Sequence, residues 1–413
     1  MENYQQGRNK VAYREINLRE QEIQHVPIAV YRRIEQDLRS KVRSGAWRAG
    51  TLIPSRKALS REYGVDLRTV QRAIGLLLDD GTLSAENGRG TFVTDQSTGN
   101  PRLSGWLESK DVRTIGLIVD HIGTTAEHGA RAITQSIHSA VRAFSSNYRI
   151  ITFETIDATV EEAAAHEADA LGLVEHQGLA GAIVWHSGSS QTIPIMRRIL
   201  QHRIPMVLID RLPPGLNCDF VGIDNIFSAR EATEYLLSLR HRRIAFLAPA
   251  DPISSLDDRL EGYKMAIERA GLTVDENLVF RPPLNESLVL DKLKVQFDQI
   301  VTRIQTMAEP PTAIFAANDV LAQHTVNALE AAGLKVPDSI SVIGMDDIER
   351  FSPRPPFLTS MRQPFDMIGE RAARILLERM ECHPDANDPF PSFRQILLPT
   401  KLVERKSCRA YTE

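Results

Sequence analysis

Basic and polar residues in the first part of the chain have the types and the spacing of a nucleic-acid contact surface. In VDLRTVQRAIGLLLDDG (65–81), Arg68, Thr69 and Arg72 face away from an apolar stripe when the segment is drawn as a helix. Arginines placed in this way can reach base edges or phosphates in the major groove of DNA. The segment therefore predicts a DNA-contacting helix, and the alternative is a small helical domain whose arginines are only solvated.

The surrounding sequence supplies elements that would hold this helix. Apolar residues recur at helical spacing over residues 28–42, a second helix is expected in IPSRKALSREYG (53–64), and Asp66 has the residue type of an N-cap for the third. The segment TLSAENGRGTFVTD (82–95) has the pattern of two strands around an Asn-Gly turn. Three helices and a hairpin predict a winged helix-turn-helix, with Arg89 at the wing tip, where it would contact a phosphate or the minor groove.

A second set of candidate residues follows short apolar runs in the rest of the chain. Runs such as TIGLIVD (114–120), IPMVLID (204–210) and ISVIGMDD (340–347) alternate with helical segments. This alternation predicts mostly parallel sheets, and the segment is too long for one sheet, so two lobes are expected. In open α/β sheets, ligands bind beyond the carboxyl ends of the strands.

The polar residues at these strand ends would together suit a polyhydroxylated ligand. Carboxylates, an amide and a guanidinium pair with hydroxyl groups, and an indole ring covers the C–H surface of a sugar. A helix that starts at Arg259 is expected after the strand ending at Pro249. An Asp or Asn after a strand is more often a helix cap, so the hypothesis depends on convergence of the whole set. The candidates are Asp120, His121, Trp185, His186, Asp210, Arg211, Arg259, Asn318, Asp319, Asp346 and Asp347.

Charge is distributed unevenly along the chain. Residues 26–95 hold 12 Lys and Arg against 8 Asp and Glu, a local charge of +4; the whole chain carries −4, which leaves −8 for the remainder. A basic module joined to an acidic one is the pattern of a DNA-binding domain attached to a domain with another task. Chance clustering of solvated charges is the alternative interpretation.

Composition excludes several other classes of protein. Of the 413 residues, 42% are hydrophobic and 25% are charged, as in soluble globular proteins, and no apolar run is long enough for a membrane span. Residues 1–24 lack the apolar core of a signal peptide. Cys218, Cys382 and Cys408 are scattered, so neither a disulfide framework nor a metal site is expected. We expect a cytoplasmic protein with no cofactor and no membrane partner.

Residues 46–93, AWRAGTLIPSRKALSREYGVDLRTVQRAIGLLLDDGTLSAENGRGTFV, resemble the GntR family of bacterial winged-helix regulators. The resemblance implies that the second helix opens with a DNA-contacting basic residue and that the third helix reads DNA. It places a winged-helix domain at 26–95, after an N-terminal extension (1–25) and before a polar linker (96–112). The implied DNA-binding residues are Arg56, Lys57, Arg68, Thr69, Gln71, Arg72 and Arg89.

This chain departs from the GntR pattern at the start of the third helix. The family has a Ser-Arg pair where this chain has Asp66 and Leu67, and it has an arginine at the position of Gln71. A usual DNA-contacting arginine is therefore missing, and Arg68, one position further on, is its expected replacement. The operator is expected to differ from the family's commonest sequences.

Residues 113–413 resemble the effector domain of the LacI family, which has the two-lobed periplasmic sugar-binding fold. The resemblance is carried by segments such as VGIDNIFSAREATEYLLSLRHRRIAFLAP (221–249) and LLPTKLVERKS (397–407). It implies an α/β fold with one lobe at 113–222 and 364–390, and the other at 223–363 and 391–413. With Trp185 added for its aromatic face, the implied effector-binding residues are Asp120, Thr124, Glu127, Trp185, His186, Asp210, Arg259, Asn318, Asp319, Asp346 and Gln363.

The combination of both modules is similar to that of the AraR-type arabinose repressors of Gram-positive bacteria. It implies a homodimeric repressor that binds double-stranded operator DNA and responds to a small sugar bound between the lobes. The LacI hinge helix has no counterpart here, so its mechanism is not carried over. A transport or chemosensory sugar-binding protein would leave residues 26–95 unexplained. An enzyme would need a Ser-His-Asp order, a metal cluster or a phosphate loop, and the sequence shows none of these.

Overall fold

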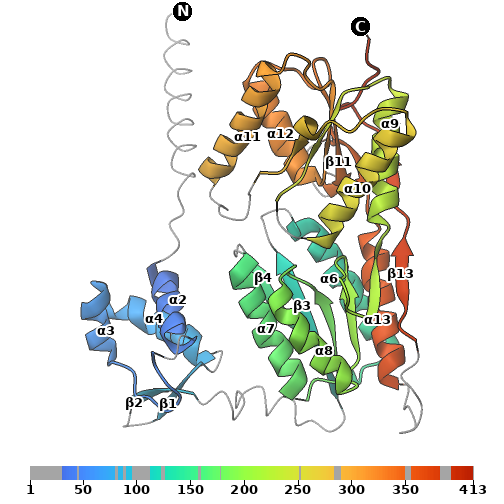
Figure 1. Ribbon diagram of the computed structural model, residues 1–413. Coiled ribbons are helices and arrows are strands. Elements are labelled where there is room, and N and C mark those ends of the chain that lie inside the picture. Colours follow the sequence, from blue (N-terminus) through green and yellow to red (C-terminus); the bar gives the residue numbers. More distant parts are fainter. Residues whose placement is uncertain are drawn as a thin grey trace, which may run out of the picture. The chain divides into compact units, whose positions relative to one another are not determined.

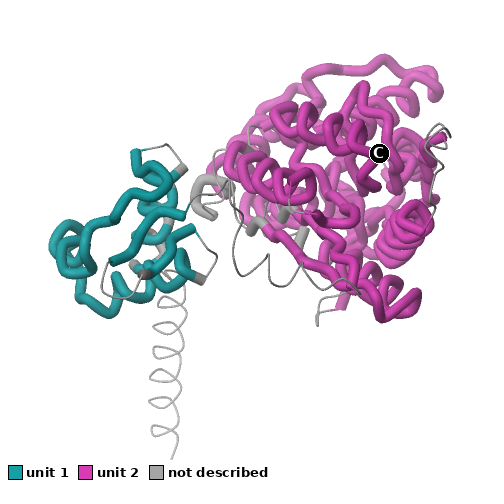
Figure 2. Tube along the Cα trace, turned by 90° about the horizontal axis from the view of Figure 1, so that it is seen from below, with its two compact units in different colours: residues 1–108 teal, residues 109–413 magenta. Residues whose placement is uncertain are grey.

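The computed structural model divides into two compact units, residues 1–108 (unit 1) and 109–413 (unit 2), which are coloured separately in Figure 2. The division falls inside the segment expected to be a linker. Among the described residues, no helix is both long and apolar enough to cross a membrane. The structure describes residues 30–43, 46–79, 82–86, 90–94, 112–121, 126–156, 160–176, 178–250, 253–282, 290–348, 355–381 and 392–412.

Unit 1 has the winged-helix order of elements that the sequence predicts (Figure 1). The antiparallel pair β1–β2 is in a register that opposes Leu83 to Val93. Leu52 forms an isolated antiparallel bridge to Phe92, so the chain before α3 pairs with β2 at one point. The elements are α2 (Val30–Arg43), α3 (Arg56–Tyr63), α4 (Leu67–Asp79), β1 (Leu83–Glu86) and β2 (Gly90–Val93).

Local signals set the ends of α3 and the buried face of α4. The Ser55 side chain accepts a hydrogen bond from the Ala58 amide at 3.2 Å and caps α3, and Gly64 ends that helix at a φ of 63°, which glycine adopts without strain. Val70 and Ile74 are buried on one side of α4. They form one core with buried apolar residues of α2, α3, β1 and β2, and burial of this apolar surface stabilises unit 1.

Unit 2 contains two six-stranded sheets, and the first one defines the first lobe. Its strands run in the order β13-β7-β6-β5-β3-β4, and every pair is parallel. The strands are β3 (Arg113–His121), β4 (Tyr148–Ile156), β5 (Gly181–Trp185), β6 (Met206–Ile209), β7 (Asp219–Ile223) and β13 (Gln395–Leu398). The helices are α6 (Ala126–Phe144), α7 (Val160–His176), α8 (Ile193–Gln201) and α13 (Phe365–Glu381), with a short 3₁₀ turn at Ser190–Thr192.

Strand β5 shows how two helical layers cover this sheet. Ile183 and Trp185 belong to the core formed with α6 and α13, whereas Ala182 and Val184 belong to the core formed with α7 and α8. All are buried, as in a parallel sheet covered on both faces. Helices α6 and α13 approach closely at Gly369, where a Cβ atom would lie 2.6 Å from the Ile133 carbonyl oxygen.

The second sheet defines the second lobe and runs in the order β14-β12-β11-β10-β8-β9. Its pairs are parallel except for the antiparallel edge pair β12–β14. The strands are β8 (Ile244–Leu247), β9 (Val279–Phe280), β10 (Ala313–Ala316), β11 (Ser341–Asp346), β12 (Thr359–Arg362) and β14 (Lys401–Val403). The helices are α9 (Asn225–Ser238), α10 (Ser254–Arg269), α11 (Leu290–Thr306) and α12 (Asp319–Ala331), with a 3₁₀ turn at Glu276–Leu278.

The chain passes between the lobes three times, and one passage lies where the sequence did not predict it. The passages connect β7 to α9, β12 to α13, and β13 to β14. Residues 391–413 were expected in the second lobe, but β13 pairs in parallel with β7 of the first. The second lobe therefore resumes only after Leu398. The four residues of β13 are too few to show a hydrophobic periodicity that would assign them to one sheet or the other.

Candidate functional site

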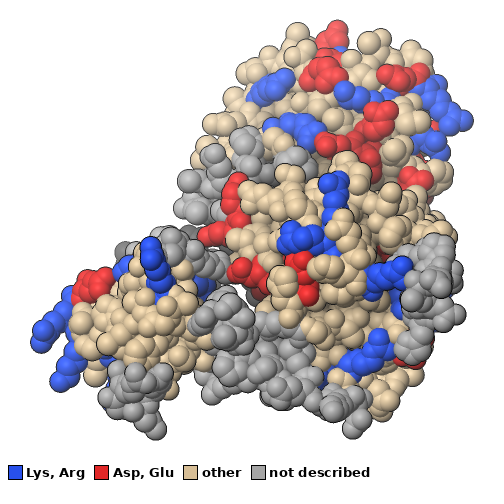
Figure 3. Space-filling view, turned by 60° about the horizontal axis from the view of Figure 1, so that its bottom comes forward, with Lys and Arg blue, Asp and Glu red and all other residues tan. Residues whose placement is uncertain are grey.

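The outward face of α4 carries the predicted DNA-contacting side chains. Arg68, Gln71 and Arg72 are exposed, while Thr69 is half-buried at the flank. Their position follows from the helical period, because Val70, Ile74 and Leu77 occupy the opposite face and are buried. On the side shown in Figure 3, basic side chains project along the edge of unit 1, whereas both signs are mixed over unit 2.

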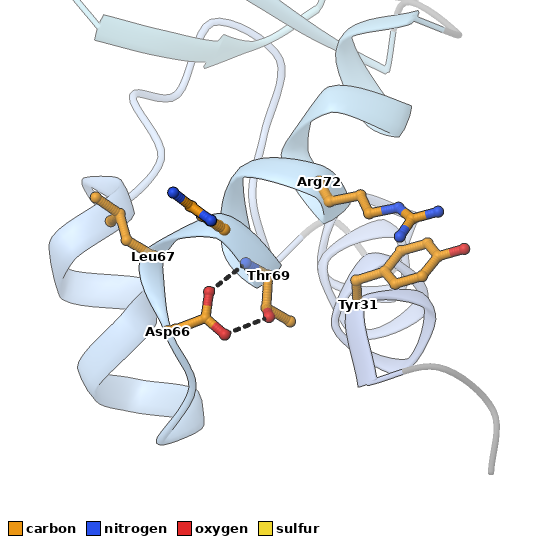
Figure 4. A pocket seen from close by; sticks show the side chains of 6 residues that line it. Tyr31, Asp66, Leu67, Thr69 and Arg72 are labelled. Carbon is orange, nitrogen blue, oxygen red and sulfur yellow. Dashed lines mark hydrogen bonds between the residues drawn. The ribbon is translucent and has the colours of Figure 1, made fainter.

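Asp66 caps α4 and engages both polar groups of Thr69. One carboxylate oxygen accepts the Thr69 backbone N–H and the other accepts its hydroxyl, each at 2.9 Å (Figure 4). These bonds, the backbone one first, lower the pKa of Asp66, so the cap is ionised at neutral pH. The predicted N-cap is therefore present, and it occupies the place of the family's serine.

Arg72 is held against a ring from α2. The centre of its guanidinium lies 4.0 Å from the centroid of the Tyr31 ring. Tyr31, Asp66, Leu67, Arg68, Thr69 and Arg72 line one open hollow of about 550 Å³ over the start of α4. The side chain of Leu67, at the family's arginine position, is 39% exposed. The hollow thus combines two cations, one carboxylate and an apolar side chain.

The remaining predicted DNA-binding residues are Arg56 and Lys57 of α3, and Arg89. Arg56 and Lys57 are exposed at the first two positions of that helix. Arg89 lies outside the described residues. Tyr31 was not predicted, although an aromatic residue at the start of the first helix was visible in the sequence.

In unit 2, five of the predicted effector-binding residues converge between the two lobes, where the ends of β5, β6 and β11 meet the passage from β12 to α13. We call these five residues the interlobe cluster: Trp185, Asp210, Arg259, Asp346 and Gln363. The Trp185 indole N–H donates to Asp210 Oδ2 at 3.0 Å in the first lobe. Gln363 Nε2 donates to Asp346 Oδ1 at 2.7 Å, and so links the passage before α13 to the end of β11.

Arg259 supplies the cation of the interlobe cluster. Its residue is 4% exposed, and its guanidinium donates to Asn225 Oδ1 at 2.8 Å and to the Ala317 carbonyl at 2.5 Å. Arg259 was expected to begin its helix, but α10 begins at Ser254, so the side chain projects from the second turn. The earlier start was missed because Ser254 and Ser255 give no apolar period.

The two carboxylates of the cluster influence each other across the lobes. Burial raises the pKa of Asp346 to about 6, although the charge of Arg259 and the hydrogen bond from Gln363 lower it, and the charge of Asp210 adds to the rise. Asp210 and Asp346 both adopt positive φ, 64° and 114°. The Oε1 atom of Gln363 is buried without a hydrogen-bond partner among the described residues. The cluster therefore has unused capacity to accept hydrogen bonds.

Two predicted ligand contacts, Asn318 and Asp319, form hydrogen bonds within the second lobe itself. Asn318 caps α12, and its Oδ1 accepts the amides of Val320 and Leu321. Asp319 is completely buried and accepts from Ser360 Oγ at 2.6 Å and the Ile348 amide at 2.9 Å; burial raises its pKa well above the usual range. Asn318 therefore has the helix-cap role that was the alternative to a ligand contact, whereas Asp319 is bonded to residues outside its own helix.

His186 belongs to a buried group that the sequence did not reveal. Its Nδ1 lies 2.8 Å from Glu167 Oε1, and Glu167 also accepts from the Ser187 amide and the Thr192 hydroxyl. Both His186 and Glu167 are 2% exposed. Burial alone would raise the pKa of Glu167, but these partners hold it below its usual value.

The other first-lobe candidates are only partly described. Asp120 is the last residue but one of β3 and Glu127 lies in α6, but their side chains are outside the description, as is all of Thr124. His121 is likewise described only in its backbone. No group of three or more His, Cys, Asp or Glu that could hold a metal ion occurs among the described residues.

Comparison with protein families assigns a domain to each unit. Residues 30–93 match the model described as bacterial regulatory proteins, gntR family, and residues 233–408 match the periplasmic binding protein-like domain. The arabinose metabolism transcriptional repressor of Geobacillus stearothermophilus is 26% identical over 355 residues, which cover 85% of this chain and 91% of that protein. The HTH-type transcriptional regulator DegA of Bacillus subtilis is 31% identical over 219 residues, 53% of this chain.

Several relatives are matched over only part of their length. The alignment spans 60% of DegA and 51% of the transcriptional repressor PurR of Vibrio atlanticus. Solved structures of similar fold include the complex of the regulator CelR with cellobiose, with a TM-score of 0.59 and 22% identity over 86% of this chain and all of that one. A LacI family regulator of Enterococcus faecium with bound ribose gives a TM-score of 0.57 and 24% identity, covering 73% of this chain and all of that one. The chain thus joins a gntR-family regulatory domain to a periplasmic binding protein-like domain of LacI-like fold.

Proposed function

We propose that this protein is a transcription repressor that binds operator DNA through unit 1 and loses affinity for it when a small sugar binds at the interlobe cluster. The observation that carries the proposal is the joining of a gntR-family domain to a two-lobed domain whose buried cluster has unused acceptors. Relatives described as regulators and repressors support this function over a transport protein or an enzyme. Such a regulator acts in the cytoplasm.

In the proposed mechanism, α4 enters the major groove and the hairpin lies beside it. Arg68, Gln71 and Arg72 face the bases or the adjacent phosphates, while Arg56 and Lys57 contact the backbone. A homodimer would place two such helices on a two-fold related operator. The GntR-type signature supports the DNA partner, and the acidic remainder of the chain favours contact through unit 1 alone.

The ligand chemistry follows from the cluster. Asp210 and Asp346 accept hydrogen bonds from hydroxyl groups, Arg259 donates one, and the indole of Trp185 offers a face to C–H groups. Because Asp210 and Trp185 belong to the first lobe while Arg259 and Asp346 belong to the second, a ligand that binds all four favours one angle between the lobes. A sugar that prefers this angle shifts the dimer away from its DNA-binding form. Arabinose, cellobiose and ribose occur in the names of similar proteins and enter as test ligands.

The test combines a sugar panel with operator binding. We expect at least one pentose, hexose or disaccharide to raise the melting temperature and to release the protein from a genomic fragment selected by it. Arg259→Ala should abolish both sugar effects and leave operator binding intact, because Arg259 lies in unit 2. Arg281→Ala is the matched control, since the described bonds of Arg281 join it to the Asp257 carboxylate and the Pro249 carbonyl oxygen and not to the interlobe cluster. A normal sugar response in Arg259→Ala would contradict the assigned pocket, and failure to select any DNA sequence would contradict the function.

A further inference from the structure

The hollow over the start of α4 contains an arginine supported from a different helix. Arg72 lies over the ring of Tyr31, with 4.0 Å between the guanidinium centre and the ring centroid (Figure 4). Tyr31 belongs to α2, which packs against α4 in the core of unit 1. Arg68, the other arginine of the hollow, has no aromatic partner among the described residues. The two arginines are therefore not equivalent.

Stacking uses the face of a guanidinium and leaves its edge available. The ring attracts the cation through its face, whereas the N–H donors point outward in the guanidinium plane. An arginine held in this way has already lost part of its side-chain freedom, so less is lost when it forms two parallel hydrogen bonds. Two parallel acceptors in the major groove are offered by guanine, at O6 and N7. A phosphate also accepts from arginine, but it needs no fixed plane.

We propose that Tyr31 is a positioning residue that fixes Arg72 to read one guanine of the operator. This inference rests on the proposed DNA-binding function. It specifies which base Arg72 recognises and which residue orients Arg72 for that recognition. The exposed Leu67 cannot donate, and we assign base reading to Arg72, five positions further along α4, in place of Arg68, which was the replacement expected from the sequence.

The charge pattern of the hollow supports a base rather than a phosphate as the partner of Arg72. The ionised Asp66 carboxylate lines the same hollow, where it accepts hydrogen bonds from Thr69 and from the Arg68 backbone amide. A carboxylate repels phosphates but accepts from the amino group that cytosine presents in the same groove. The carboxylate thus makes the surface beside Arg72 less favourable for a phosphate than the two arginines alone would, and it is compatible with base edges.

The test compares base preferences of full-length variants by selection from random DNA. We expect Tyr31→Leu and Arg72→Lys to lose the preference for guanine at one operator position, with about a fivefold loss of affinity for the selected site, while Tyr31→Phe retains both. Arg68→Lys is the control and should leave that position unchanged. Thermal melting checks that the variants fold.

The outcomes separate the inference from the function on which it rests. If Tyr31→Leu and Arg72→Lys weaken all sequences equally and reduce the salt dependence, Arg72 contacts a phosphate and the inference is overturned. An unchanged preference in Tyr31→Leu would overturn the positioning role even if Arg72 reads the base. Absence of any sequence preference in the unmodified protein would instead overturn the proposed function.

Discussion

At the scale of single residues, the most consequential feature is a pair of carboxylates, Asp210 from the first lobe and Asp346 from the second. Asp346 has a pKa of about 6 because it is buried, despite the nearby cation Arg259 and the hydrogen bond from Gln363. An unfolded aspartate titrates near 4. The folded protein therefore binds more protons between these values, and the contribution of Asp346 makes unit 2 less stable as the pH rises from about 4 to 6.

The same titration gives a testable prediction for ligand binding. A sugar whose hydroxyls donate to ionised Asp346 lowers its pKa, so binding near pH 6 should release protons and affinity should increase from about pH 5 to 7. Calorimetry in buffers with different ionisation enthalpies measures this release. Asp346→Asn cannot titrate and should remove it. Proton uptake, or a release unaffected by this substitution, would place the ligand elsewhere.

Residue types alone could not distinguish a ligand contact from a structural one. Asp319 comes shortly after β10 and Asp346 ends β11, yet Asp319 is bonded to Ser360 and Ile348 within the lobe, whereas Asp346 meets the passage between the lobes. His186 likewise turns to Glu167, which lies 19 positions earlier in α7. These partners come from elements distant in sequence, so only the fold could reveal them.

At the scale of elements, α6 and α13 approach closely at Gly369 of α13. Gly369→Ala would place a Cβ atom 2.6 Å from the backbone oxygen of Ile133, and a backbone atom cannot rotate away. We expect unit 2 to lose about 1–3 kcal/mol of unfolding free energy, measured by urea denaturation.

Gly172 of α7 provides the opposite control. A Cβ atom there has no neighbour within 4 Å, so Gly172→Ala should stabilise α7 by up to about 1 kcal/mol. Equal effects of the two substitutions would show that helix propensity, and not the approach of α6, governs Gly369.

The elements themselves were largely predictable. The 3.6-residue period gave the three helices of unit 1, and the β–α alternation gave most strands of both sheets. Boundaries were missed where side chains carry no period, as at Ser254, the first residue of α10. The sheet of β13 was missed because four residues, Gln395–Leu398, can pair at the edge of either sheet, and only the parallel pairing with β7 decides between them.

At the scale of the whole molecule, the chain has two units with separate cores. A ligand that binds only the folded form of unit 2 stabilises that unit by mass action, by about 2.7 kcal/mol at one hundred times its dissociation constant. We therefore expect two thermal transitions, of which the sugar shifts only the one belonging to unit 2. A selected operator fragment should shift the transition of unit 1, and scanning calorimetry measures both transitions. One shared transition that both ligands shift equally would contradict independent units.

The three passages between the lobes affect how such proteins can be recombined. Neither lobe is encoded by one continuous stretch, because β13 and α13 return to the sheet begun by β3. A gene chimera made with a single junction after Ile223 would combine a sheet from one parent with an edge strand and a covering helix from the other. Exchange of ligand preference between relatives by whole-lobe replacement therefore needs junctions at all three passages, near residues 224, 363 and 399.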